Sequence, residues 1–147
     1  MSGPDLESAL GPVLAEAFRQ RGYSELTAVQ QAVLDPALAG RDLRISSQTG
    51  SGKTVALGLA IRDLISTPAS PAPNDAEHGG AHPRRMAHPR AIAVAPTREL
   101  AKQLEDELSW LFGSFRAGVA SVTGGASYRD EQRALAALEQ HHALVVE

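Results

Sequence analysis

The chain of 147 residues contains no cysteine, which excludes a disulfide framework, a cysteine-based zinc site and a cysteine nucleophile. It has no apolar run long enough to span a membrane, and residues 1–5 lack the basic and apolar regions of a secretion signal. These absences predict a protein that is neither exported nor membrane-bound, with a cytoplasmic location.

An excess of positive charge is also missing. The formal net charge is -3 and the isoelectric point is about 5.9, which excludes binding of nucleic acid through overall basicity. A nucleic-acid site would have to be local, built from a few placed Arg, Thr and backbone N–H groups. The hydrophobic content of 43% is sufficient for the core of one compact domain without metals or disulfides.

Helical periodicity dominates the first 40 residues, in which apolar side chains recur at spacings of three and four. The pattern predicts one amphipathic helix over residues 5–21, closed by Gly22, and a second helix over residues 27–39. Thr27 is a suitable N-cap for the second helix, and Gly40 is a suitable stop.

The rest of the chain alternates short apolar runs with helical segments, which is typical of βαβ units and of a parallel α/β sheet flanked by helices. Residues 91–95 form a continuous apolar run ended by Pro96, which predicts a strand buried on both faces. Strands are predicted over 42–47, 91–95, 119–122 and 143–146, and helices over 53–65, along the stripe Leu100, Leu104, Leu108 and Leu111, and over 127–139.

Residues 67–90 interrupt this alternation. They are rich in proline, contain a glycine pair and have almost no large apolar side chain, which predicts a disordered surface insertion. His78, His82 and His88 lie within it, and a metal site is one interpretation. Their irregular spacing and the lack of partner ligands favour solvated loop residues instead.

Residues 47–54, Ser-Gln-Thr-Gly-Ser-Gly-Lys-Thr, have the arrangement of a phosphate-binding P-loop between a predicted strand and a predicted helix. Glycines let successive backbone N–H groups point into one concavity, and the following helix adds its positive N-terminal end. Lys53 offers a charge to the β- and γ-phosphates and Thr54 offers a hydroxyl to Mg²⁺, which are the two catalytic roles we predict. Ser47 stands where the strict pattern has glycine. Nucleotide binding is predicted for Gly50, Ser51, Gly52, Lys53 and Thr54, and magnesium binding for Thr54.

Three further segments carry recognisable motifs. Residues 22–30 read Gly-Tyr-Ser-Glu-Leu-Thr-Ala-Val-Gln, residues 95–100 read Ala-Pro-Thr-Arg-Glu-Leu, and the pair Gly124-Gly125 follows. Together with the P-loop and in this order, they resemble the Q motif, motif Ia and motif Ib of the DEAD-box RNA helicases. The resemblance extends from about Gly22 to residue 147.

The resemblance implies a partial RecA-like P-loop NTPase domain over residues 1–147, with N-terminal helices and the Q-like motif in residues 1–40. The parent protein would be an ATP-dependent RNA helicase that hydrolyses ATP with Mg²⁺ to unwind or remodel RNA. A second RecA-like domain would complete the motor.

The same resemblance assigns four binding residues. Gln30 would read adenine, because a glutamine amide donates and accepts at once and matches adenine N6–H₂ and N7 in a way that guanine cannot. Thr97, Arg98 and Gly125 would contact the sugar-phosphate backbone of single-stranded RNA without reading its sequence.

Two features depart from the family pattern. Leu26 and Ala28 stand where the Q motif usually has prolines, and Leu6 is the nearest apolar residue at the upstream distance where the family has an aromatic one. The 147 residues also contain no Asp-Glu-Ala-Asp or Ser-Ala-Thr motif, so we expect the chain alone to be catalytically inactive. The strands that bear those motifs lie between the P-loop strand and the motif Ia strand in the family, so we also expect a gap in the sheet.

Two alternatives stay open at the level of sequence. One is a non-catalytic nucleotide-binding or interaction module, and the other is a fragment of a DNA-directed superfamily 2 helicase. The second is disfavoured by the Pro-Thr-Arg-Glu-Leu sequence of residues 96–100 and by the Q-like motif.

Overall fold

A parallel sheet forms one side of the molecule in the computed structural model, which describes residues 5–66, 89–123, 127–137 and 143–146. Its strands are β1 (Pro89–Ala93), β2 (Gly118–Ser121) and β3 (Ala143–Val146), in the order β1-β3-β2. The central strand β3 pairs parallel with both neighbours, so that Val145 lies between Ile92 and Ala120. The predicted parallel α/β architecture is therefore confirmed for the described residues.

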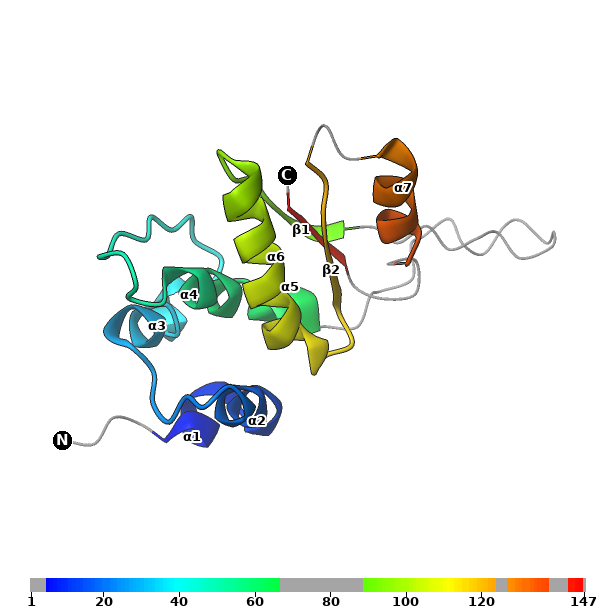
Figure 1. The fold of residues 1–147 in the computed structure, drawn as a ribbon. Coiled ribbons are helices and arrows are strands. Elements are labelled where there is room, and N and C mark those ends of the chain that lie inside the picture. The colour runs from blue at the N-terminus through cyan, green and yellow to red at the C-terminus, as the bar shows by residue number, and fades with distance from the viewer. Residues whose placement is uncertain (1–4, 67–88, 124–126, 138–142, 147) are drawn as a thin grey trace, which may run out of the picture.

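Two helices connect these strands. Helix α6 (Arg98–Gly113) follows β1 and packs against β2, and helix α7 (Tyr128–Ala137) follows β2. The two helices lie to either side of the strands in Figure 1. The leucine stripe predicted α6 correctly, because Leu108 and Leu111 are fully buried and Leu104 packs against the core.

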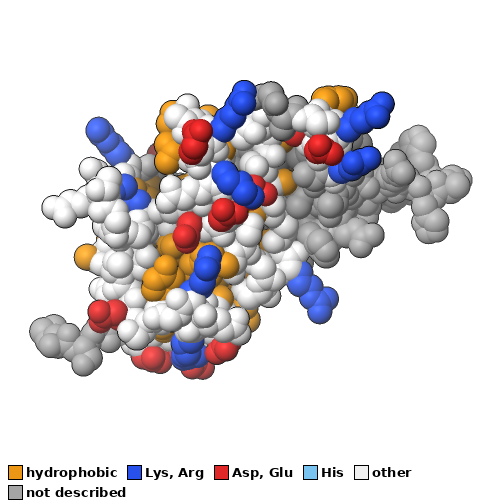
Figure 2. Space-filling model, in the orientation of Figure 1, with side chains coloured by type: hydrophobic (Ala, Val, Ile, Leu, Met, Phe, Trp, Pro, Cys, Tyr) orange, Lys and Arg blue, Asp and Glu red, His pale blue; other side chains and the backbone are white. Residues whose placement is uncertain are grey.

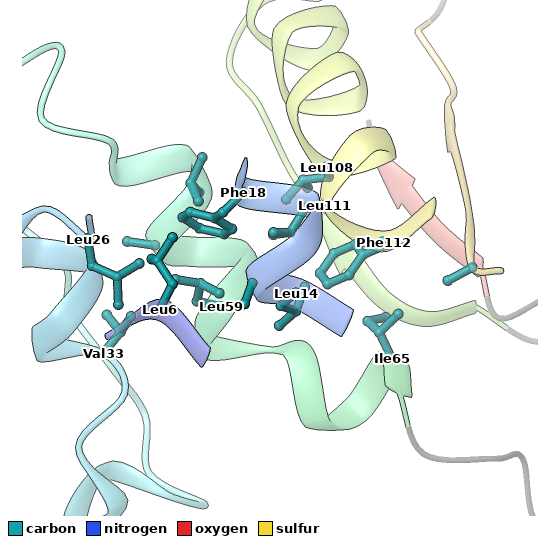
Figure 3. Close-up of a cluster of buried hydrophobic side chains, with 14 of the residues drawn as sticks. Leu6, Leu14, Phe18, Leu26, Val33, Leu59, Ile65, Leu108, Leu111 and Phe112 are labelled. Carbon is teal, nitrogen blue, oxygen red and sulfur yellow. The ribbon is translucent and has the colours of Figure 1, made fainter. Parts of the chain in front are cut away.

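The main core lies between α6 and the elements that precede the sheet. Its contributors include α2 (Pro12–Gln20), α4 (Lys53–Ala60) and α5 (Arg62–Ser66), and Figure 3 shows their apolar side chains meeting those of α6. Helix α4 comes so close to α6 that a methyl group at Gly58 would collide with the side chains of Leu111 and Leu108. No helix within the described residues is long and apolar enough to cross a membrane.

The helix predicted over residues 5–21 is two helices, α1 (Leu6–Leu10) and α2, joined at Gly11. Pro12 begins α2, and a proline disfavours helical geometry in the residue before it, so one continuous helix was the wrong prediction.

The helix predicted over residues 27–39 is likewise shorter. Helix α3 (Ala28–Ala32) is followed by the 3₁₀ turn η1 (Pro36–Leu38), which Asp35 caps by accepting a hydrogen bond from the backbone N–H of Ala37. The cause is again a proline, because Pro36 has no N–H to continue the α3 ladder. The predicted helix over residues 53–65 is interrupted at Ile61, where α4 ends and α5 soon begins.

The strand predicted over residues 42–47 is not formed. This segment makes no backbone–backbone hydrogen bond with any described residue, and Leu43 is 39% exposed. An alternating sequence becomes a strand only when a neighbour pairs with its N–H and C=O groups, and the described sheet has β1 and β2 at its edges instead. The segment before the P-loop therefore has no pairing partner in the part of the chain that the structure describes.

The strand predicted to be buried on both faces is half-buried on one face and exposed on the other. Ala91 and Ala93 pack against the core, whereas Ile92 is 64% exposed and Val94 is 78% exposed. Pro89 and Arg90 belong to β1, so the predicted insertion over residues 67–90 does not include them. Its remaining residues 67–88, with the three histidines, lie outside the described residues.

Candidate nucleotide-binding site

The loop before α4 is curved by two glycines with positive φ, Gly50 at 78° and Gly52 at 85°. Only glycine adopts this left-handed geometry without a steric cost, and here it turns the chain directly into the first residue of α4. The N-terminal N–H groups of α4 have no partner within the helix, so the loop ends on a positive helix terminus. This is the local geometry that binds a phosphate group.

The side chain of Lys53 lies over this loop. Its Nζ atom donates to the carbonyl oxygens of Ser47 and Gln48, both at 2.6 Å. The ammonium group is thus held at the loop by neutral carbonyls, and no carboxylate of the described residues pairs with it. A phosphate would compete well for it, because a phosphate brings a full opposite charge to the ammonium group, whereas a carbonyl offers only a dipole.

Two hydroxyl groups complete the loop. The Oγ atoms of Ser47 and Ser51 lie 2.6 Å apart and share a hydrogen bond. Ser47, which stands in place of the usual first glycine, therefore links the two ends of the loop. Thr54 is half-buried in the first turn of α4, beside Lys53. Its hydroxyl is a hard oxygen ligand of the kind that Mg²⁺ prefers. Within the described residues, no group of three or more His, Asp or Glu side chains could hold a metal by itself.

Gln30 reaches the same loop from α3. It is 6% exposed and forms a capping box with Thr27, in which its Oε1 accepts from the Thr27 N–H at 3.0 Å. Its Nε2 donates to the carbonyl oxygen of Gly52 at 3.4 Å. The structure therefore brings together two predicted site residues that are 22 positions apart in the sequence.

Contact between Gln30 and the loop is tight. A methyl group at position 52 would collide with the Gln30 side-chain nitrogen, so Gly52 serves a close approach as well as a turn. Sequence reasoning missed this contact, because no local pattern relates the two residues. Leu6, the upstream apolar residue noted above, is 3% exposed in the core cluster and offers no free surface for a base.

Two of the three residues predicted to contact RNA lie at the start of α6. Thr97 caps the helix, with its side-chain oxygen accepting from the Leu100 N–H at 3.3 Å. Arg98 is exposed and makes no ion pair with any of the described residues. No hydrogen bond or ion pair within the described part of the chain links Thr97 or Arg98 to the P-loop. Gly125 lies outside the described residues.

Charges around Arg98 are mixed. Lys102, one turn further along α6, pairs with Glu105 at 3.0 Å and Asp106 at 3.2 Å, and hydrogen bonds to these two carboxylates raise the pKa of its ammonium group. Figure 2 shows basic and acidic side chains interspersed over this view of the surface. Any phosphate contact here would therefore rest on single placed groups, as the net charge predicts.

A glycine-rich loop that leads into a helix of a parallel α/β fold defines the chain as a P-loop nucleotide-binding domain. The family model of the DEAD/DEAH box helicases matches residues 27–147, and the chain belongs to this family.

Relatives and solved structures agree with this assignment. The chain is 41% identical over 123 residues to the DEAD-box ATP-dependent RNA helicase 3B, chloroplastic, of Zea mays, covering 83% of this chain and 15% of the relative. It is 35% identical over 123 residues to the ATP-dependent RNA helicase SrmB of Escherichia coli (strain K12), covering 83% of this chain and 24% of the relative. The chain thus spans a quarter or less of the length of these relatives.

The RNA helicase Prp28 from Chaetomium thermophilum, solved bound to ADP, matches with a TM-score of 0.70 and 30% identity. The match covers 91% of this chain and 29% of that one. A hypothetical ATP-dependent RNA helicase from Sulfolobus tokodaii matches with a TM-score of 0.63 and 23% identity, which supports the fold alone. The predicted fold class, a partial RecA-like P-loop domain, is confirmed.

Proposed function

We propose that this chain is the ATP-binding part of an ATP-dependent RNA helicase, whose parent protein hydrolyses ATP to unwind or remodel RNA. One observation carries the proposal: the Gln30 amide lies 3.4 Å from the carbonyl oxygen of Gly52. The residue proposed to read adenine and the loop proposed to hold phosphates therefore form one site. Names of the relatives, which are ATP-dependent RNA helicases, support the same conclusion.

The side-chain amide of Gln30 has hydrogen-bonding groups that the fold does not use, and these groups match adenine. Its Nε2 has two N–H groups and donates one to Gly52, and its Oε1 has two lone pairs and accepts one bond from Thr27. One donor and one acceptor remain. Adenine offers the N7 acceptor and the N6–H₂ donor, whereas guanine offers two acceptors and would leave the Gln30 oxygen unpaired.

Phosphates would bind at Gly50, Ser51, Gly52, Lys53 and Thr54. Lys53 would exchange the carbonyls of Ser47 and Gln48 for the β- and γ-phosphates, and Thr54 would supply an oxygen ligand to Mg²⁺. The metal would supply charge neutralisation of the phosphates. Thr97, Arg98 and Gly125 would bind the RNA backbone, and a second RecA-like domain would act with this one in the parent protein.

Binding without turnover is the expected behaviour of these 147 residues. They contain no Asp-Glu-Ala-Asp motif to orient the attacking water, and phosphoryl transfer depends on such positioning. We expect phosphate release at background level in a coupled assay, with or without RNA. RNA-stimulated release that disappears in Lys53→Ala would show that the chain carries a complete catalytic apparatus.

The test of the proposed function is the thermal stabilisation of the chain by ADP and by GDP. A ligand at about a hundred times its dissociation constant should stabilise the folded chain by roughly 2.7 kcal/mol, which raises the melting temperature. Lys53→Ala should remove most of this shift, because it removes a charged phosphate donor. Lys102→Ala, at the only other lysine, is the control and should keep it.

Gln30→Ala should differ in kind from Lys53→Ala. It should retain stabilisation by both nucleotides and lose the preference for ADP over GDP, while Gln20→Ala, at an exposed glutamine of α2, should keep the preference. Equal stabilisation of the unmutated chain by ADP and GDP would overturn the role of Gln30. An unchanged ADP shift in Lys53→Ala would overturn the assignment of the phosphate site.

A further inference from the structure

The segment that leads to Gln30 begins with a tight helix end. At the end of α2 the Gly22 N–H donates to the Arg19 carbonyl at 2.9 Å, and the Tyr23 N–H donates to the Phe18 carbonyl at 3.0 Å. With Gly22 at a φ of 81°, this is a Schellman motif. An apolar contact between the residue after the glycine and the third-last helical residue accompanies that motif, and here it joins Tyr23 to Phe18 at 5.7 Å between ring centroids.

A third ring, from α6, completes this contact. Trp110 meets Phe18 edge-on at 5.4 Å and lies 6.0 Å from Tyr23. The chain has only six aromatic residues, three Phe, two Tyr and one Trp, and half of them gather here. We define this group of Phe18, Tyr23 and Trp110 as the aromatic cluster.

The indole of Trp110 is itself held in place from two directions. Its Nε1–H donates to the Glu107 carboxylate at 2.9 Å, and the Arg21 guanidinium lies over the ring at 5.4 Å from its centroid. Neither partner belongs to the phosphate loop or to α3. Trp110 is therefore a fixed surface of α6, against which Tyr23 is placed.

Few other contacts fix the chain between Tyr23 and Thr27. Residues 24–26 make no backbone–backbone hydrogen bond with the described residues, and one side-chain bond reaches them, from the Gln31 Nε2 to the Leu26 carbonyl at 3.0 Å. Leu26 is 5% exposed and anchors the segment in the core, which leaves Tyr23 as the anchor at its start. The capping box of Thr27 and Gln30 follows directly, so the position of Gln30 depends on how this segment leaves α2.

We propose that Trp110 is a positioning residue for adenine recognition: by holding Tyr23, it fixes the segment that presents Gln30 to the nucleotide site. The inference rests on the proposed function for its ligand, but the geometric part can be measured without one. Trp110 lies on α6, the helix that Thr97 caps and Arg98 begins, and it thereby supports the base-reading side chain on α3.

Hydrogen exchange of the full chain, without nucleotide, measures that geometric part. Trp110→Ala should raise exchange of the Gln30 and Gln31 backbone N–H groups by about three- to tenfold, since each aromatic pair contributes about 0.5 to 1.5 kcal/mol. Exchange in α4 should stay unchanged. Trp110→Phe should restore most of the protection, because a smaller ring still meets Tyr23.

The preference for ADP over GDP measures whether this change at Gln30 weakens adenine recognition. In Trp110→Ala the preference for ADP over GDP should fall by about threefold or more, while the affinity for inorganic pyrophosphate should stay the same. Leu104→Ala is the matched control on α6, because Leu104 packs against the core and is not part of the aromatic cluster. It should change neither exchange at Gln30 nor the preference.

Each outcome decides the inference. Unchanged exchange at Gln30 in Trp110→Ala overturns it, and so does an equal rise in Leu104→Ala or across the whole chain. If Trp110→Ala does not fold, Tyr23→Ala removes the same contact from the other side, and the same comparisons apply to it. An unmutated chain without ADP preference overturns the adenine-reading role of Gln30 in the proposed function, whereas the exchange data still decide whether Trp110 positions Gln30.

Discussion

At the scale of single residues, Gly52 must satisfy two conditions at once. Its φ of 85° requires glycine, and the Gln30 amide occupies the space that a side chain would need. Gly50 has a similar φ of 78°, but nothing lies within 4 Å of the position that a methyl group would take there. The two glycines therefore separate the effect of backbone strain from the effect of contact with Gln30.

We predict that Gly50→Ala costs about 1 to 2 kcal/mol of unfolding free energy, because alanine is strained in left-handed geometry. Gly52→Ala should cost more and should also reduce the preference for ADP over GDP, because the new methyl group displaces the Gln30 side chain. Urea unfolding and nucleotide thermal shifts measure both effects. Equal stability losses with an intact preference in Gly52→Ala would contradict the role given to this contact.

Thr97 offers a second prediction at this scale, because its side chain caps α6. Thr97→Ala should lower the unfolding free energy by about 1 kcal/mol in the absence of RNA, whereas Thr97→Ser should keep the cap. The measurement is urea unfolding of the two variants. A loss of RNA affinity in Thr97→Ala must then be compared with Thr97→Ser, and equal stability in all three proteins would mean that the cap contributes nothing.

The sequence predicts residue roles well where they depend on local pattern. Thr27 is an example, since an N-cap is defined by its immediate neighbours and Thr27 caps α3. It does not predict the bond from Gln30 to Gly52 or the contact of Tyr23 with Trp110, because these residues meet only through the packing of separate elements.

At the scale of helices, the closeness of α4 and α6 depends on Gly58. Alanine favours a helix over glycine by about 1 kcal/mol, so propensity alone would predict stabilisation on replacing Gly58. The collision with Leu108 and Leu111 opposes this, and overpacking of a core costs about 1 to 3 kcal/mol.

We therefore predict that Gly58→Ala destabilises the chain, while Gly113→Ala is neutral or stabilising. Gly113 is the last residue of α6 and has nothing within 4 Å of the position that a methyl group would take. Denaturant unfolding of both variants gives the comparison. Stabilisation by Gly58→Ala similar to that of Gly113→Ala would show that α4 and α6 can separate without loss.

The periodicity of apolar residues is insufficient to predict where the helices begin and end. The apolar spacing predicts α6, but it runs through Pro12 and Pro36 and joins elements that these prolines separate. Periodicity reports which face is buried, whereas backbone restrictions decide where a helix begins and ends. Both signals are present in the sequence, and at these two positions the proline restriction outweighs the apolar spacing.

At the scale of the whole molecule, three of the four predicted strands are formed, as β1, β2 and β3, and the errors concern the pairing of residues 42–47 and the burial of residues 91–95. Residues 42–47 alternate as a strand does, and residues 91–95 are as apolar as a strand buried on both faces. Whether such a segment is paired or covered depends on other parts of the sheet. In the structure the first segment has no paired neighbour among the described residues, and the second has one exposed face.

The last prediction concerns two exposed side chains, Ile92 in β1 and Val94 directly after it. Ile92 and Val94 are 64% and 78% exposed, so replacing either with threonine, which also suits a strand, should change the unfolding free energy by only about 0.5 kcal/mol. Exposed apolar side chains at a sheet edge favour association, so these variants should also self-associate less than the unmutated chain. Urea unfolding and light scattering over a range of concentrations measure the two effects.

Ala120→Thr is the buried counterpart on β2, where the side chain is 4% exposed. It adds volume and a hydroxyl group to packed surroundings and should cost about 1 to 3 kcal/mol. If Ile92→Thr costs as much as Ala120→Thr, this face of β1 is covered in solution. Self-association that is unchanged in Ile92→Thr and Val94→Thr would place the contact between molecules on another surface.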